Sequence, residues 1–211
     1  MWVEGNSSTV AEALAALGAG DAIVYPTETF YALGVDALSS QALELLFAIK
    51  GREPGKAVAL IAADTAMAFA VASEVPTEAR VLAEAFWPGP LTLVLPARNG
   101  IPAALIGDDG GVGVRVSSHP LARALAAALR GPLTATSANL AGEPPAVEPA
   151  GVRRALGDKI KVFVEDGKLA GGAPSTVVAV DRCGIRVLRP GAVSEHQLAA
   201  ALKGTAHRGE A

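Results

Sequence analysis

The sequence lacks several features that would assign it to a class at once. It has a single cysteine, Cys183, so no disulfide can form within the chain and a reducing compartment is expected. No apolar run is long enough to cross a membrane. The N-terminus also lacks the basic segment and following apolar segment of a secretory signal. We therefore expect a cytoplasmic protein that does not associate with membranes.

Aromatic residues and excess positive charge are also scarce. Aromatic residues make up 4% of the chain, and the formal net charge is -3. A protein that binds nucleic acid through nonspecific phosphate contacts is usually basic overall. Any anion site in this chain must therefore be local. The histidines are scattered, and no Cys/His spacing indicates a structural zinc site. We expect no protein-built metal site.

Small apolar residues are abundant. The chain has 211 residues, of which 51% are hydrophobic, enough for one well-buried core. Periodicity and capping signals predict helices at 7–20, 39–50, 64–73, 76–86, 120–130 and 193–202. Apolar runs predict strands at 21–26, 57–63, 91–97, 112–118, 132–139, 161–166, 175–181 and 185–190. Residues 27–38 and 139–151 read as loops. The alternation, with hairpins at the end, predicts an α/β fold with a mixed sheet.

A short basic loop follows the predicted helix at 39–50. Lys50, Arg52 and Lys56 lie within seven positions, separated by two glycines and a proline. A cation at a helix C-terminus complements the helix dipole, which is enough to explain Lys50. The helix dipole explains Lys56 less well, because that residue lies beyond the glycines and proline that follow the helix. Three cations on a Gly-rich turn would also suit a polyphosphate, although the P-loop pattern is absent.

Arg115 lies in the middle of an apolar predicted strand. A buried arginine is costly unless it meets an anion. That anion is either an internal carboxylate or the carboxylate or phosphate of a ligand, and the sequence leaves both possibilities open.

Hydroxyl and amide side chains gather at the ends of other predicted strands. Thr27 and Thr29 flank Glu28 directly after one strand, and Ser137 and Asn139 end another. Such groups bind ligands at strand ends or form ordinary hydrogen-bonded turns. Later in the chain, Ser175 and Arg189 pose the same choice. No Ser-His-Asp triad or activated cysteine is visible, so the inventory suits anionic substrates better than covalent catalysis.

Taken together, seven stretches resemble one family in composition and order. They are YPTETFYALG (25–34), KGREPGK (50–56), FWPGPLTLVLP (86–96), VGVRV with HP (112–120), TSANLAG (136–142), PSTVV (174–178) and RPGAV (189–193). Their order is similar to that of the YrdC/TsaC-type threonylcarbamoyl-AMP synthases. The resemblance covers about residues 20 to 193, nearly the whole chain.

The resemblance implies a fold and an activity. Such enzymes have a twisted, open, mixed parallel and antiparallel sheet flanked by helices, around a positively charged cavity. They are nucleotidyltransferases that join L-threonine, bicarbonate and ATP into threonylcarbamoyl-AMP, releasing diphosphate. A downstream transferase then modifies adenosine in certain tRNAs. A divalent ion, Mg²⁺, is expected as cofactor, held mainly by the ATP phosphates. tRNA is a further possible partner.

The resemblance also implies roles for single residues. Lys50 and Arg52 match catalytic residues. The matches to ATP-binding positions are Lys50, Arg52, Lys56, Ser137, Asn139 and Arg189. The matches to threonine-binding positions are Thr29, Arg115 and Ser175.

Three positions depart from the family pattern. Glu53 stands where proline often follows the arginine directly, Ala32 where glycine is usual, and Ile61 where many members have histidine. Ile61 puts one side-chain contact to threonine in question. We expect the short form of the family, with a single domain over residues 1–203 and a flexible tail at 204–211.

Two other functions fit part of the pattern. One is an RNA-binding module of the same fold without synthase activity, which the negative net charge and few aromatics weaken. The other is a carbamate-adenylating domain of a hydrogenase-maturation protein, whose additional domains and cysteine motifs this sequence lacks.

Overall fold

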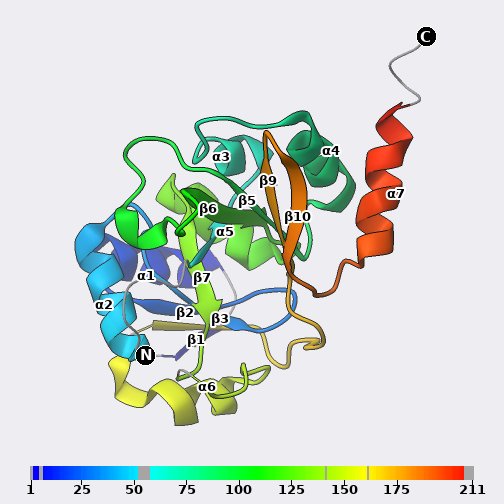
Figure 1. Cartoon of the computed structure of the whole chain (residues 1–211). Coiled ribbons are helices and arrows are strands. Elements are labelled where there is room, and N and C mark those ends of the chain that lie inside the picture. Colours follow the sequence, from blue (N-terminus) through cyan, green and yellow to red (C-terminus); the bar gives the residue numbers. More distant parts are fainter. Residues whose placement is uncertain (1, 5–6, 52–57, 141, 161, 207–211) are drawn as a thin grey trace.

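Most of the chain forms one mixed sheet with helices on both faces (Figure 1). The computed structural model describes residues 2–4, 7–51, 58–140, 142–160 and 162–206. Within them the strand order is β1-β8-β2-β3-β7-β4-β6-β5-β9-β10. The strands are β1 (Trp2–Glu4), β2 (Ile23–Pro26), β3 (Tyr31–Gly34), β4 (Ala59–Ala62), β5 (Leu91–Pro96), β6 (Gly111–Val116), β7 (Leu133–Ser137), β8 (Val162–Glu165), β9 (Thr176–Asp181) and β10 (Gly184–Arg189).

The strand pairs run in both directions, as the sequence predicted. β4 and β6 are parallel, and so are β5 and β9. β7 is antiparallel to both of its neighbours, β3 and β4. β9 and β10 form the predicted C-terminal hairpin, whose turn lies between Asp181 and Gly184. The predicted mixed, open sheet is confirmed.

Helices cover the two faces of the sheet and bury two clusters of apolar side chains. The helices are α1 (Ser7–Gly18), α2 (Ser40–Lys50), α3 (Thr65–Phe69), α4 (Thr77–Phe86), α5 (Pro120–Leu129), α6 (Pro149–Leu156) and α7 (Glu195–Ala206). On one face, α1 and α5 pack on the sheet with Leu17, Leu125 and Ile61 in a smaller core. On the other face, a larger core includes Leu46 of α2 and Leu82 of α4.

The prediction of a loop over residues 27–38 is partly wrong. Residues Tyr31–Gly34 form β3, which pairs with β2 in a tight antiparallel hairpin. All four are buried, with Leu33 in the larger core and Ala32 against the smaller one. The predicted loop is therefore confined to the polar residues before β3 and the segment after it.

Two further elements escaped the sequence analysis. The end of the predicted loop at 139–151 begins α6, with Pro149 in its first turn. β1 pairs in parallel with β8 at one edge of the sheet. Neither element changes the fold class, because both lie at the periphery.

The last helix, α7, packs beside α4 and projects at one side of the molecule (Figure 1). It reaches Ala206, so residues 204–206 of the predicted tail are helical, and residues 207–211 lie outside the described residues. None of the helices in the described ranges is long and apolar enough to span a membrane.

Candidate functional site

A cavity of about 520 Å³ lies over the centre of the sheet, on the same face as the smaller core. Its floor is a row of small side chains on adjacent strands, including Ala59, Gly113 and Val94. A Cβ at Gly113 would lie 3.7 Å from the Ala59 Cα and 3.7 Å from Val94 Cγ2. Because alternate residues of a strand share a face, Gly111, Gly113 and Arg115 all line the cavity.

Arg115 brings a positive charge to this floor. Arg115 is 6% exposed, and its guanidinium pairs with the carboxylate of Glu28 in the turn between β2 and β3. The Ser117 hydroxyl donates to the other oxygen of the same carboxylate. Burial lowers the pKa of Arg115 to about 10, so it stays charged at neutral pH. The structure confirms the internal carboxylate as the partner of Arg115. Arg115 also lines the cavity, and its contact with a ligand anion there stays a prediction.

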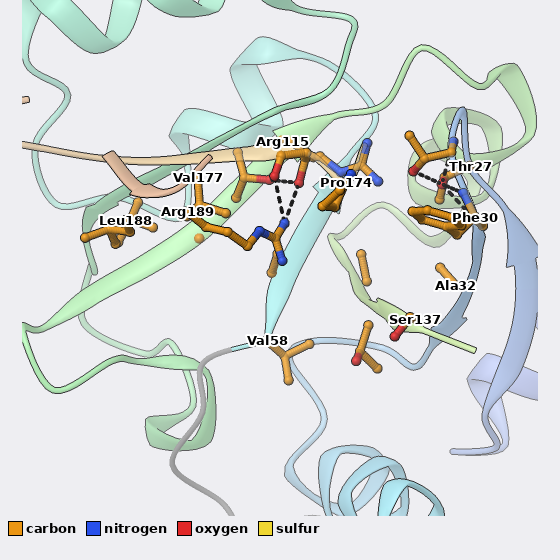
Figure 2. Close-up of a pocket in the computed structure, with 18 of the residues that line it drawn as sticks. Thr27, Phe30, Ala32, Val58, Arg115, Ser137, Pro174, Val177, Leu188 and Arg189 are labelled. Atoms are coloured by element: carbon orange, nitrogen blue, oxygen red, sulfur yellow. Dashed lines mark hydrogen bonds between the residues drawn. The ribbon is translucent and has the colours of Figure 1, made fainter. Parts of the chain in front are cut away.

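Arg189 enters the cavity from a different strand, β10. Figure 2 shows Arg189 on one side of the cavity and Thr27 and Phe30 on the other, with Arg115 between them. The Arg189 Nη2 donates to the Ser175 carbonyl at 2.8 Å and to its hydroxyl at 3.1 Å. The Ser175 hydroxyl also lies 2.9 Å from Thr92 Oγ1. Burial lowers the pKa of Arg189.

A close backbone approach fixes this side of the cavity. A Cβ on Gly191 would lie 2.2 Å from the Pro174 carbonyl oxygen and 2.6 Å from the Thr176 nitrogen. The turn after β10 therefore requires glycine in order to pack against residues 174–176, of which Pro174 and Ser175 line the cavity beside Arg189.

The turn between β2 and β3 forms the opposite wall. The Thr27 hydroxyl donates to the Phe30 carbonyl at 2.7 Å and accepts from the backbone nitrogens of Thr29 and Phe30. The Thr29 carbonyl accepts from the Gly171 nitrogen at 3.0 Å. The hydrogen-bonded turn is therefore confirmed and it lines the cavity, while ligand binding by its hydroxyl groups stays a prediction.

Lys50 and Asn139 lie behind the wall that Ser137 forms. The Lys50 Nζ donates to the Ser137 carbonyl at 2.8 Å, the Asn139 carbonyl at 2.7 Å and the Asn139 Oδ1 at 2.8 Å. Lys50 and Asn139 are each 6% exposed. Asn139 does not line the first cavity but borders a second one of about 560 Å³, and Pro145 lines both cavities.

The structure thus brings together most of the predicted site residues that it describes. Those that line the cavity are Thr29, Arg115, Ser137, Ser175 and Arg189. Lys50 and Asn139 are linked to the cavity through Ser137. Arg52 and Lys56 lie outside the described residues. The ligand contacts assigned to all of these residues stay predictions.

The family departures have different surroundings. Ala32 lines the cavity, and it pairs in register with Ser137 across β3 and β7. Ile61 is fully buried in the smaller core and does not line the cavity, although it pairs in register with Arg115, which does. Position 61 is therefore part of the protein core rather than of the cavity wall. Glu53 lies outside the described residues.

The sequence analysis missed Glu28 and Ser117 as members of the site. Glu28 carries the one carboxylate in the stretch 25–34, and Arg115 required an anion. Those two signals are compatible with the pair, but only the tertiary fold brings the two side chains together. Thr92 and Pro174 offered no comparable signal, because each looks like an ordinary strand or loop residue.

His119 occupies the position before α5, but its side chain makes no capping bond and is 10% exposed. The Nε2 lies 3.0 Å from the Asp166 carboxylate, and the buried Nδ1 has no hydrogen-bond partner among the described residues. Burial lowers the pKa of His119 more than Asp166 raises it. Cys183 lies exposed in the β9–β10 turn.

A protein-family model, that of Sua5, YciO and YrdC, matches residues 15–191; it is described as "Telomere recombination". The chain belongs to the Sua5/YciO/YrdC family. This confirms the resemblance seen in the sequence motifs.

Relatives and solved structures agree with this assignment. The threonylcarbamoyl-AMP synthase of Chromohalobacter salexigens is 40% identical over 173 residues, 82% of this chain and 92% of that protein. A putative threonylcarbamoyl-AMP synthase of Mycobacterium tuberculosis is 35% identical over 199 residues, 94% of this chain and 91% of that protein. The crystal structure of P. abyssi Sua5 complexed with L-threonine superposes with a TM-score of 0.91 at 30% identity. That match covers 96% of this chain and 61% of the P. abyssi chain.

Proposed function

We propose that this Sua5/YciO/YrdC protein is an L-threonylcarbamoyladenylate synthase. It joins L-threonine, bicarbonate and ATP into threonylcarbamoyl-AMP and releases diphosphate. One observation carries the proposal: Arg115 and Arg189 enter one cavity of about 520 Å³ in a chain related to curated synthases. That volume lies within the range of about 300–1,000 Å³ that is usual for small-molecule sites.

The electrostatics of the cavity suit this reaction. Threonine carboxylate, bicarbonate and ATP are all anionic, so their encounter in water is opposed by Coulomb repulsion. Arg115 and Arg189 offset that repulsion with fixed charges inside a partly enclosed site, where they are stronger than in bulk water. In this proposal Arg115 holds the threonine carboxylate, with Thr29 and Ser175 as further contacts, and Arg189 and Ser137 contact ATP.

The bond changes follow from the substrates. The threonine amine attacks bicarbonate-derived carbon, and loss of water gives a carbamate. A carbamate oxygen then attacks the α-phosphorus of ATP, and the bond to the bridging oxygen breaks as diphosphate leaves. No residue of the chain becomes covalently modified. The cavity orients the carbamate toward the phosphorus and limits access of water to both labile species.

A magnesium ion is part of this proposal. Among the described residues, no group of three His, Cys, Asp or Glu side chains is placed to hold a metal ion. The cavity carboxylate of Asp109 accepts from the Gly111 nitrogen and lies 3.6 Å from Arg186. The ion would therefore take its ligands from ATP phosphates and water, which is common for Mg²⁺. When bound it supplies charge neutralisation at the phosphates.

The direct test is to identify the product. Purified protein is incubated with ATP, L-threonine and ¹³C-bicarbonate, and the nucleotides are separated and weighed by mass spectrometry. We expect a threonine-containing adenylate that carries the label. Unlabelled AMP or ADP alone would contradict the proposal, because it would indicate simple ATP hydrolysis.

The product implies a downstream partner. Threonylcarbamoyl-AMP is an activated acyl donor, so a tRNA threonylcarbamoyl transferase is expected to consume it. RNA binding without synthesis is the opposing outcome of the same test: a chain that binds tRNA with strong salt dependence and makes no adenylate would be an RNA-binding module.

A further inference from the structure

The ammonium group of Lys50 is fully used by the protein itself. An ammonium has three N–H groups, and among the described residues Lys50 Nζ has three oxygen acceptors at 2.7 to 2.8 Å. Those acceptors lie 87 and 89 residues further along the chain. Lys50 is the last residue of α2, and Gly51 ends that helix in a left-handed conformation. The side chain therefore ties the end of α2 to the turn after β7.

Asn139 is the centre of that turn. Its Oδ1 accepts from Lys50 Nζ at 2.8 Å and from the Ser137 hydroxyl at 2.5 Å. Its Nδ2 donates to the Glu143 carbonyl, which closes the turn on the other side. One buried side chain thus holds three separate points of the wall between the two cavities. Such a network is stable only while every member is satisfied.

Ser137 transmits this arrangement to the cavity. Its carbonyl accepts from Lys50, and its hydroxyl donates to Asn139, while the residue itself lines the cavity. With its proton committed to Asn139, the Ser137 hydroxyl presents lone pairs to the cavity. It therefore suits a donor group of a substrate, such as a ribose hydroxyl or an amine.

We propose that Lys50 is a positioning residue, which acts on the substrates through Asn139 and Ser137 instead of contacting the ATP phosphates. This proposal rests on the proposed synthase function and changes the role that the motif resemblance implied for Lys50. For Lys50 to bind a phosphate, its ammonium would have to leave at least one of three protein oxygens. The abandoned oxygen would then lose a charge-assisted hydrogen bond at a buried site.

Substitution by arginine separates the two roles. Arginine keeps the positive charge and binds phosphates well, but its planar fork cannot serve three acceptors around one point. We expect Lys50→Arg to weaken ATP binding about tenfold or more, as much as the uncharged Lys50→Met. Lys203→Met on the exposed end of α7 is the matched control and should bind ATP normally. ATP affinity is measured by calorimetry, after circular dichroism has confirmed folding.

A double-mutant cycle with Asn139→Ala completes the test. If Lys50 acts through Asn139, adding Lys50→Arg to Asn139→Ala costs little further ATP affinity. The same non-additivity is expected in the midpoint of urea unfolding, which is measured without ATP. Near-normal ATP binding by Lys50→Arg would overturn the positioning role of Lys50 but not the proposed function. Fully additive losses of ATP affinity in the double mutant would do the same. A wild-type chain that binds no ATP would instead refute the proposed function.

Discussion

Arg115 shows how one residue links the stability of the site to its chemistry. Its guanidinium is buried beside the cavity, and Glu28 supplies the opposing charge from a turn 87 positions earlier in the chain. A buried ion pair contributes little net stability, but removing one partner is costly. The pair is therefore better understood as holding a cation at the cavity surface, ready for an anionic ligand.

We predict that Arg115→Lys impairs threonine use more than ATP use. Lysine retains the charge but loses the two-pronged hydrogen bonding that suits a carboxylate. The KM for threonine should rise about tenfold or more, with a smaller change in the KM for ATP. Arg80→Lys, on α4, is the control. An unchanged threonine KM would remove Arg115 from the carboxylate role.

We predict that Glu28→Gln destabilises the fold. Glutamine can still hydrogen bond to Arg115 and Ser117, but it leaves the buried guanidinium without an opposing charge. The free energy of unfolding should fall by about 1–3 kcal/mol, measured by urea denaturation. Glu148→Gln removes an exposed carboxylate paired with Lys168 and should change stability little. Equal stability of the Glu28 variant and the wild type would contradict the account.

The sequence analysis identified Arg115 as a candidate site residue but did not identify Glu28 as its partner, for a physical reason. An arginine between valines is conspicuous because burying it is costly. The carboxylate that compensates it lies on another element, and only the tertiary fold brings the two together. The same holds for Lys50, whose position after a helix offered a sufficient local explanation.

At the scale of elements, strand β6 leaves room for the cavity because two of its cavity-facing positions are glycines. Gly111 and Gly113 alternate with buried valines, so the cavity face of the strand has no side chain until Arg115. Neighbouring Ala59 and Ala135 continue the low floor across β4 and β7. A deep site over a sheet requires this run of small residues.

We predict that Gly113→Val closes the floor without unfolding the protein. The added Cβ would lie 3.5 Å from Thr92 Cγ2, an ordinary contact, and the methyl groups would occupy the cavity. Binding of ATP or threonine should weaken about tenfold or more, while the melting temperature changes little. Gly113→Ala should have an intermediate effect. A valine variant that binds both substrates normally would place the site elsewhere.

His119 should make stability depend on pH. Its side chain is largely buried, and burial holds its pKa below the ordinary value of 6.5, against the opposite effect of Asp166. The unfolded chain therefore takes up a proton first as the pH falls. The free energy of unfolding should decline below about pH 6.5 until the pH passes the folded-state pKa.

Comparison of two variants checks this prediction. His119→Gln should flatten that part of the pH profile, measured by urea denaturation between pH 5 and 8 in steps. His196→Gln removes an exposed histidine on α7 and should leave the profile unchanged. A wild-type slope that survives in His119→Gln would show that another group is responsible.

Most elements could be predicted because their apolar pattern is local. The strand at 112–118 and the helix at 120–130 appear in the structure as β6 and α5. β3 was missed because its four residues follow a polar turn and include Gly34, which resembles loop composition. α6 was missed because prolines and glycines surround it. In these elements, tertiary packing outweighs local propensity.

At the scale of the whole molecule, the sheet order assembles the site. β10, β9, β5, β6, β4 and β7 are adjacent in the sheet, although only the pairs β5–β6 and β9–β10 among these neighbours are consecutive in the sequence. Their cavity-facing residues therefore converge from stretches spread over more than half of the chain. The sequence predicted which motifs would be involved, through their resemblance to a family, but physical patterning alone does not give the order of the strands.

The central claim is tested most directly by diphosphate release from ATP by the purified chain. The assay contains L-threonine, bicarbonate and Mg²⁺, and each co-substrate is omitted in turn, with L-serine as a replacement for threonine. The account predicts release that requires both co-substrates and prefers threonine. Release that is independent of threonine or bicarbonate, or no release while tRNA still binds, would contradict it.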